Sequence, residues 1–350
     1  MSIHKPLFYI TVIISFIIFQ NKLYAQKINE LLKIDSILTL KSNKPFNGIV
    51  FISQNGVNQY TKILGYADLN KKTPLKMNSQ FVIGSISKQF TAVLTLSEFD
   101  KGKIDLFTPI RKYIPELEQK WADTVTVHHL LTHMHGIEEL DQPTEFQVGT
   151  QYSYSQIGYD LLAKIIERTS GESFATLSNN LFKKCGMKNT FHPDIEKYNN
   201  LVKGYTENNR GEVEFDSLTF NNYVAAGSFI STTSDLDKWN NLLYSGKLLK
   251  KETMAMLLTK HKGAIRNHSI FGITEYGYGI TIDKKDGIVQ LGQTGYSPGF
   301  VSMNFYFPEN KTSLIILENV VYDTNDIKKT FHYHTEILAI LRDKIKNDKL

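Results

Sequence analysis

The stretch "FVIGSISKQFTAVLTLSEFDKGK", residues 81–103, combines a short polar motif with the pattern of a buried helix. Its apolar residues recur at a helical period and predict a helix that enters a core: Phe90, Val93, Leu94 and Leu96. Gly102 can end this helix. At its start, Ser85 and Lys88 form S-x-x-K, and residues three apart lie on one face of a helix.

This motif is suited to nucleophilic catalysis. A serine hydroxyl becomes a good nucleophile when a neighbouring base removes its proton, and a desolvated lysine can be that base. The start of a helix also offers free backbone N–H groups that favour developing negative charge at Ser85. By itself the motif is unspecific, because the same spacing occurs at Ser2–Lys5. The alternative is a capping serine beside a solvated lysine.

Strand patterns lie on both sides of this segment. "GIVFISQNGVNQYTKILGYA" predicts two strands around Asn55-Gly56, the strongest short hairpin signal. Toward the end, "YGYGITID", "IVQLGQTG", "FVSMNFYF" and "TSLIILENV" predict three or four more strands. Helical patterns cover residues 27–40, most of 85–260, and the stretch from about Asp326 to Ile345.

This order of elements predicts a discontinuous α/β sheet domain, residues 26–104 and 266–350. Residues 105–265 form a mainly helical insertion between its two halves. A chain of 350 residues with 41% apolar content is long enough for one large or two modest domains. The net charge of +5 is spread evenly, which argues against a nucleic-acid partner.

The N-terminus has the pattern of a signal peptide, residues 1–25. Lys5 precedes an uncharged run from Leu7 to Phe19, too short to span a bilayer comfortably, and cleavage is expected after Ala25. The protein is therefore expected to be exported, periplasmic or secreted, without stable membrane insertion after cleavage. An uncleaved anchor is the alternative. The single cysteine, Cys185, allows no intramolecular disulfide.

A second serine motif in the sequence could also indicate catalysis. Gly295–Gly299 spells G-x-S-x-G, and Asp323 with His332 or His334 could complete a triad around Ser297. A nucleophile elbow needs a helix after its serine, whereas a strand pattern follows Pro298, so Ser297 is not the predicted nucleophile.

A group of histidines raises the question of a metal site. Four of them fall close together in the sequence: His128, His129, His133 and His135. Their spacing fits no regular zinc pattern, and the sequence predicts neither a metal nor a cofactor. A metal-dependent hydrolase remains an alternative.

Several segments in order resemble the serine beta-lactamase-related hydrolases. They are "FVIGSISKQFTAV", "IDLFTPIRKYIPEL", "VTVHHLLTHMHGI", "VGTQYSYSQIGYDLLAKIIERTSG", "CGMKNTF", "AAGSFISTTSDLDKWNNLL" and "GQTGYSPGF", within residues 30–345. This family includes class C beta-lactamases, D-Ala-D-Ala carboxypeptidases and esterases with the penicillin-binding-protein fold. The resemblance implies an antiparallel sheet flanked by the N- and C-terminal helices, with an inserted helical region.

The resemblance also assigns catalytic roles. Ser85 is similar to the family's nucleophile and Lys88 to its partner lysine. Tyr154 corresponds to the tyrosine of the family's Y-x-N element, which exchanges protons with the serine and the leaving group. This role requires a phenol made more acidic by nearby cations such as Lys88. Tyr152 is the nearest competitor, and Gln156 replaces the usual asparagine, one methylene longer.

The third family element, K-T-G or H-T-G, is matched by Gln293-Thr294-Gly295. By resemblance, Gly295 lets a substrate carbonyl lie against the strand, and the N–H of Tyr296 joins that of Ser85 as an oxyanion hole. Gln293 lacks the usual positive charge, which weakens the hold on a substrate carboxylate and on an ionised Tyr154.

The functional hypothesis is an exported serine hydrolase that cleaves an ester or amide bond of a small-molecule or peptide substrate through an acyl-Ser85 intermediate. Gln293 favours a peptidase or esterase over an efficient beta-lactamase. The alternative is a catalytically weak relative that binds peptidoglycan fragments or another ligand.

Overall fold

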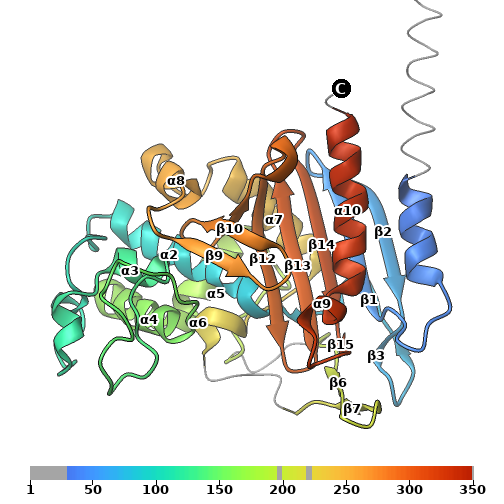
Figure 1. Cartoon of the computed structure of the whole chain (residues 1–350), viewed down its shortest axis with the longest axis horizontal. Helices are drawn as coiled ribbons and strands as arrows, with labels where there is room; N and C mark the ends of the chain where they lie inside the picture. The colour runs from blue at the N-terminus through green and yellow to red at the C-terminus, as the bar shows by residue number, and fades with distance from the viewer. Residues whose placement is uncertain (1–29, 195–198, 218–222, 349–350) are drawn as a thin grey trace, which may run out of the picture. The chain divides into compact units, whose positions relative to one another are not determined.

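The computed structural model describes residues 30–194, 199–217 and 223–348 (Figure 1). The predicted signal peptide lies outside the described residues. Contacts divide the chain into two units, residues 46–332 and the pair of terminal segments on either side of them. Within the described part of the chain, no helix has the length and apolar character needed to cross a membrane.

An eight-stranded sheet forms the framework of residues 46–332, with the strand order β2-β1-β14-β13-β12-β11-β10-β9. Every neighbouring pair runs antiparallel. The strands are β1 Gly48–Gln54, β2 Val57–Leu64, β9 Ile265–His268, β10 Gly272–Tyr276, β11 Thr281–Asp283, β12 Gln290–Ser297, β13 Phe300–Phe307 and β14 Thr312–Glu318. The prediction of a mixed α/β chain with a large antiparallel sheet is confirmed.

The predicted hairpin at Asn55-Gly56 is present between β1 and β2. Both residues have positive φ, 54° and 73°, as a two-residue turn of this type requires. Strand β1 then pairs with β14 from Gly48 opposite Glu318 to Gln54 opposite Thr312. This pairing joins the two ends of the sequence in one sheet, as the strand patterns had predicted.

The four C-terminal strands that the patterns predicted are present as β11, β12, β13 and β14, but the count was too low, because residues 265–318 also supply β9 and β10. "YGYGITID" is not one strand: β10 ends at Tyr276 and β11 begins at Thr281. Gly279 has φ +72° in the turn between them. The edge strand β9 and its neighbour β10 are short and leave Ile265 and Ile273 exposed, so they carry no clear inward-facing alternation.

Between the two groups of strands the chain is mainly helical. The helices are α2 Ser87–Asp100, α3 Val127–Leu131, α4 Ile157–Ser170, α5 Phe174–Lys184, α6 Val224–Gly227, α7 Thr233–Tyr244 and α8 Lys251–Leu258. Helices α2, α4, α5 and α6 contact one another in a group beside the sheet (Figure 1). The predicted domain boundaries at 104–105 and 265–266 stay a prediction.

Helix α2 is the centre of this helical group. The four apolar residues that predicted it are buried, and the ring of Phe90 contacts those of Phe182, Phe229 and Trp239 edge-on. It ends at Asp100, and Gly102 follows with φ +75°. Because α2 is buried nearly all round, its polar residues near the N-terminus are also buried.

Small sheets accompany the main one. β5 Phe81–Val82 pairs with β8 Ile230–Ser231, and the 3-10 turn η1 Gly84–Ile86 connects β5 to α2. β6 Tyr205–Glu207 lies between β7 Val213–Phe215 and β15 Val320–Val321.

The terminal segments form the second unit. Residues 30–39 are helical, and α10 His332–Asn347 follows the short α9 Ile327–Thr330. The Tyr333 hydroxyl donates a hydrogen bond to the Lys44 carbonyl at 2.8 Å. Helices were predicted in both regions and are present.

Candidate active site

Ser85 lies in η1, where two glycines bring the turn against strand β12. Gly84 has φ +54°, and a Cβ there would lie 2.5 Å from the backbone nitrogen of Tyr296. A Cβ on Gly295 would lie 2.1 Å from the carbonyl oxygen of Ile83. Only glycine allows this approach of the two backbones. The structure therefore uses Gly295 to seat the serine turn beside the Tyr296 amide.

Lys88 is fully buried beneath Ser85 and makes three polar contacts. Its Nζ lies 3.2 Å from Ser85 Oγ, 2.7 Å from Gln156 Oε1 and 2.9 Å from the carbonyl oxygen of Ala226. Both carbonyl oxygens can only accept, so they take two of the amine's N–H groups. In a neutral amine, the remaining lone pair then faces the Ser85 hydroxyl, as a general base requires.

The environment of Lys88 favours this neutral form. Burial lowers the pKa of Lys88 from its ordinary value of 10.5, against the opposing effect of Tyr154, and the charge of Arg266 lowers it further.

Gln156 occupies the predicted amide position directly before helix α4. Its longer side chain still reaches Lys88, as the 2.7 Å contact shows. The extra methylene therefore leaves the link to the lysine intact.

Tyr154 lies between two cations. Its ring centroid is 4.6 Å from Lys88 Nζ and 4.4 Å from Arg266 Cζ. The hydroxyl is buried and has no hydrogen-bond partner of ordinary geometry among the described residues. Burial alone would raise the pKa of Tyr154, but the charges of Lys88 and Arg266 outweigh it and hold the pKa below 10.0.

Tyr152 has the opposite environment. Its ring contacts the rings of His133 and Tyr276. Burial raises the pKa of Tyr152 well above 10.0. This phenol stays protonated, which makes Tyr154 the better candidate for proton exchange.

Gln293 is buried, and both its amide oxygen and its amide nitrogen form hydrogen bonds within the protein. Its Oε1 accepts from Arg266 Nη1 and Thr281 Oγ1, both at 3.0 Å, and its Nε2 donates to the Tyr276 hydroxyl at 3.2 Å. Sequence reasoning did not single out Arg266. In the sequence Arg266 is a lone arginine with no motif around it, a pattern that it shares with ordinary surface arginines.

Thr294 is oriented by a buried histidine. The Nδ1 of His268 accepts the Ile270 N–H at 3.1 Å, so the proton of the neutral ring lies on Nε2, 3.3 Å from Thr294 Oγ1. Burial, with the charges of Arg266 and Lys285, lowers the pKa of His268 to about 3. Nε2–H therefore donates to the Thr294 hydroxyl, and that hydroxyl can donate its own proton elsewhere.

Each of the four clustered histidines has its own hydrogen-bond partner. His128 Nδ1 contacts the Tyr278 hydroxyl, His129 Nδ1 contacts Thr126, and His135 Nδ1 accepts the Ile137 N–H. His133 Nδ1 accepts the Ser155 N–H, which places its proton on Nε2 toward the Tyr276 hydroxyl at 3.3 Å. Within the described ranges, no three His, Cys, Asp or Glu residues are grouped so that they could hold a metal ion.

Ser297 is the last residue of β12 and is buried. Its Oγ donates to the Gly227 carbonyl at 3.1 Å, and β13 follows after a short turn. The predicted strand after Ser297 is confirmed, and a nucleophile elbow is absent at this position.

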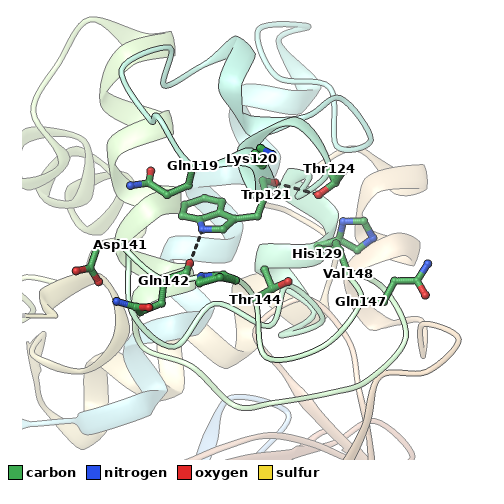
Figure 2. Close-up of a pocket in the computed structure, with 11 residues that line it drawn as sticks. Gln119, Lys120, Trp121, Thr124, His129, Asp141, Gln142, Thr144, Gln147 and Val148 are labelled. Carbon is green, nitrogen blue, oxygen red and sulfur yellow. Dashed lines mark hydrogen bonds between the residues drawn. The ribbon is translucent and has the colours of Figure 1, made fainter.

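A cavity of about 640 Å³ lies near α3, and none of Ser85, Lys88 and Tyr154 lines it. Figure 2 shows Trp121 within it, with its indole N–H donating to the Gln142 carbonyl at 3.0 Å. Its other walls include His129, Thr144 and Val148.

Comparison with known proteins gives a family match. The profile of the Beta-lactamase family matches residues 43–339. Penicillin-binding protein 4* of Bacillus subtilis is 27% identical over 329 residues, covering 82% of this chain and 71% of its own length. Teichoic acid D-alanine hydrolase of Staphylococcus aureus is 25% identical over 346 residues, covering 91% and 80%.

Solved structures agree on the fold. The D-amino acid amidase of Ochrobactrum anthropi SV3 has a TM-score of 0.74 at 20% identity, covering 94% of this chain and all of that chain (100%). The octameric penicillin-binding protein homologue of Pyrococcus abyssi has a TM-score of 0.71 at 24% identity, covering 85% and 73%.

Proposed function

The chain belongs to the beta-lactamase family, and from this premise we propose that it is an exported serine hydrolase that cleaves an ester or amide bond through an acyl-Ser85 intermediate. The observation that carries the proposal is the position of Lys88. Its buried amine gives two N–H groups to carbonyl oxygens and directs the remaining position to Ser85 Oγ. This position allows the neutral amine to accept the Ser85 proton, as a general base must.

The proposed reaction has two halves. In acylation, Lys88 takes the Ser85 proton while Oγ forms a bond to the substrate carbonyl carbon, and the carbonyl oxygen becomes an anion held by the N–H groups of Ser85 and Tyr296. Tyr154 passes a proton to the leaving alcohol or amine as its bond to the carbonyl carbon breaks. In deacylation, water gives a proton to Tyr154 and attacks the same carbon, and Lys88 returns its proton to Ser85 Oγ as the ester bond breaks and the acid leaves.

D-amino-acyl esters or amides are the proposed substrate class. Support comes from the names of two similar proteins, a teichoic acid D-alanine hydrolase and a D-amino acid amidase. The neutral side chain of Gln293 forms hydrogen bonds with Arg266 and Tyr276 and, unlike a lysine at that position, offers no charge to a substrate carboxylate.

A substrate panel tests this proposal. We expect turnover of nitrophenyl esters and of D-amino-acid amides, with D-amides cleaved faster than their L-enantiomers and faster than a chromogenic cephalosporin. Rates are measured by absorbance or by released amine. Efficient turnover of the cephalosporin alone would contradict the substrate class.

We infer export from residues 1–25, which have a basic start, an apolar run and Ala25 at the expected cleavage site. Mass spectrometry of the protein purified from the periplasm or medium is expected to give Gln26 as the first residue. Recovery of the full-length chain in the membrane fraction would favour the uncleaved anchor.

Replacing Tyr154 by phenylalanine is expected to slow turnover by about 10²- to 10⁴-fold, because the proton of the leaving group loses its donor. Tyr152→Phe is the matched control, since burial keeps that phenol protonated and outside the proton path. We expect it to retain most of the activity. Equal losses in the two variants, measured as kcat/KM on a nitrophenyl ester, would mean that Tyr154 is only a packed aromatic.

A further inference from the structure

Arg266 reaches the proposed catalytic group from an edge strand of the sheet. It lies in β9, opposite Thr274 of β10, and its guanidinium extends across the sheet to β11 and β12. Nη1 donates to Gln293 Oε1 at 3.0 Å and to Thr281 Oγ1 at 3.3 Å. These contacts hold Cζ 4.4 Å from the centroid of the Tyr154 ring. The guanidinium is therefore fixed over the face of the tyrosine and is not a mobile surface group.

The groups around Tyr154 differ in whether they can carry charge. Those that face it in the described part of the chain are Ser85, Lys88, His133, Tyr152, Tyr159, Tyr276 and Arg266. Burial lowers the pKa of His133 well below 6.5, so its ring is neutral. Burial raises the pKa values of the three other tyrosines, so they are also neutral.

Lys88 and Arg266 remain as possible cations. The pKa of Lys88 is lowered, and a lysine that acts as a base is uncharged for part of the reaction. An arginine stays protonated throughout the working pH range. Arg266 thus supplies the charge that does not change during the proton transfers.

We propose that Arg266 is the fixed positive charge of this active site, a positioning residue that acts on Tyr154 and Lys88 from β9 while Gln293 holds it in place. The proposal rests on Ser85, Lys88 and Tyr154 acting as the catalytic group. The orientation of Gln293 supports it, because its amide oxygen faces the guanidinium and its amide nitrogen faces Tyr276. A lysine at 293 would instead set a second cation against Arg266.

The proposal gives a definite sign for the pH dependence. A neighbouring positive charge lowers the pKa of both a phenol and an amine. Removing Arg266 raises both values, so the groups lose their protons at higher pH. The rising limb of the acylation rate then moves to higher pH, whichever of the two groups takes the Ser85 proton.

The test compares acylation of Ser85 by a fluorophosphonate across pH in a set of variants. Arg266→Met, which keeps an unbranched side chain without the charge, is expected to be about 10²-fold slower at pH 7, with its profile shifted to higher pH. Arg266→Lys is expected to keep the wild-type profile and most of the rate. Gln293→Lys alone is expected to slow the reaction, but combined with Arg266→Met it should recover at least about tenfold of the loss.

The outcomes separate the possibilities. A purely structural arginine predicts a lower melting temperature, an unshifted pH profile and no recovery in the double variant, and that result would overturn the proposal. A wild type that the probe does not label would overturn the proposed function itself, and this role with it. If the probe labels the wild type and Arg266→Met at the same rate and with the same pH profile, only the role of Arg266 is overturned.

Discussion

Replacing Ser85 by alanine is expected to abolish labelling by a fluorophosphonate and to reduce turnover of an ester substrate by about 10⁴-fold or more. The change removes the atom that forms the acyl bond in the proposed mechanism. The fold should persist, because the side chain is half-buried and its hydroxyl contacts Lys88 and Tyr154, which belong to the proposed catalytic group. Intact-mass spectrometry after exposure to the probe measures the labelling directly, and the melting temperature confirms that the variant is folded.

Ser297→Ala is the matched control for this experiment. Ser297 carries the G-x-S-x-G spelling, but its buried hydroxyl donates to Gly227 at 3.1 Å. Its loss leaves that carbonyl without this partner, so we expect the free energy of unfolding to fall by about 1 kcal/mol. Labelling should be retained. Labelling that survives in Ser85→Ala and disappears in Ser297→Ala would reverse the assignment of the nucleophile.

The parts of the site that were predictable from the sequence are those encoded within one local element. Ser85 and Lys88 are three residues apart on the segment that starts α2, so their contact follows from helical geometry. The pairing with Tyr154 came from the resemblance, because the 65 residues between Lys88 and Tyr154 give no local rule for their approach. The structure brings them together through the contact of α2 with α4.

Gln156 and Gln293 show what residue type alone leaves open. Both are glutamines where the family pattern has another residue, and both suggested a weaker site. Gln156 still reaches Lys88, because the start of α4 places its backbone at the right distance. Gln293 turns its oxygen to Arg266, which lies 27 residues earlier on an edge strand. Gln293, which lacks the family's usual charge, thus has the charge of Arg266 beside it, and only the pairing of the strands brings the two residues together.

The fold divides in the same way. Strands β12, β13 and β14 are long, buried and central, so their apolar pattern predicted them. The edge strand β9 and its neighbour β10 have exposed apolar residues and were missed. The residue that carries the further inference sits on one of these missed strands, since β9 has four residues and no periodic pattern.

Lys88 is the residue whose environment most clearly favours chemistry over stability. Burying an amine removes its hydration, and desolvation of an ionised lysine is costly unless the group is paired or neutral. No carboxylate contacts Lys88 among its described hydrogen bonds, and two carbonyl oxygens and a hydroxyl surround it. Burial without a counter-charge therefore favours the amine over the ammonium ion and lowers the pKa of Lys88.

Replacing Lys88 by methionine or by arginine is therefore expected to slow acylation of Ser85 by about 10³-fold or more in both cases. Methionine has a similar length and no amine, whereas arginine keeps a positive charge but does not lose its proton in a protein. In the wild type, acylation should fall as the pH drops through the lowered pKa of Lys88, because protonation removes the base; the arginine variant should lack that limb. Stopped-flow labelling across pH, with melting temperatures to confirm folding, measures both effects. A rate close to wild type in a folded Lys88→Arg protein would show that the lysine acts through its charge alone, and the proton of Ser85 would then have to pass to Tyr154.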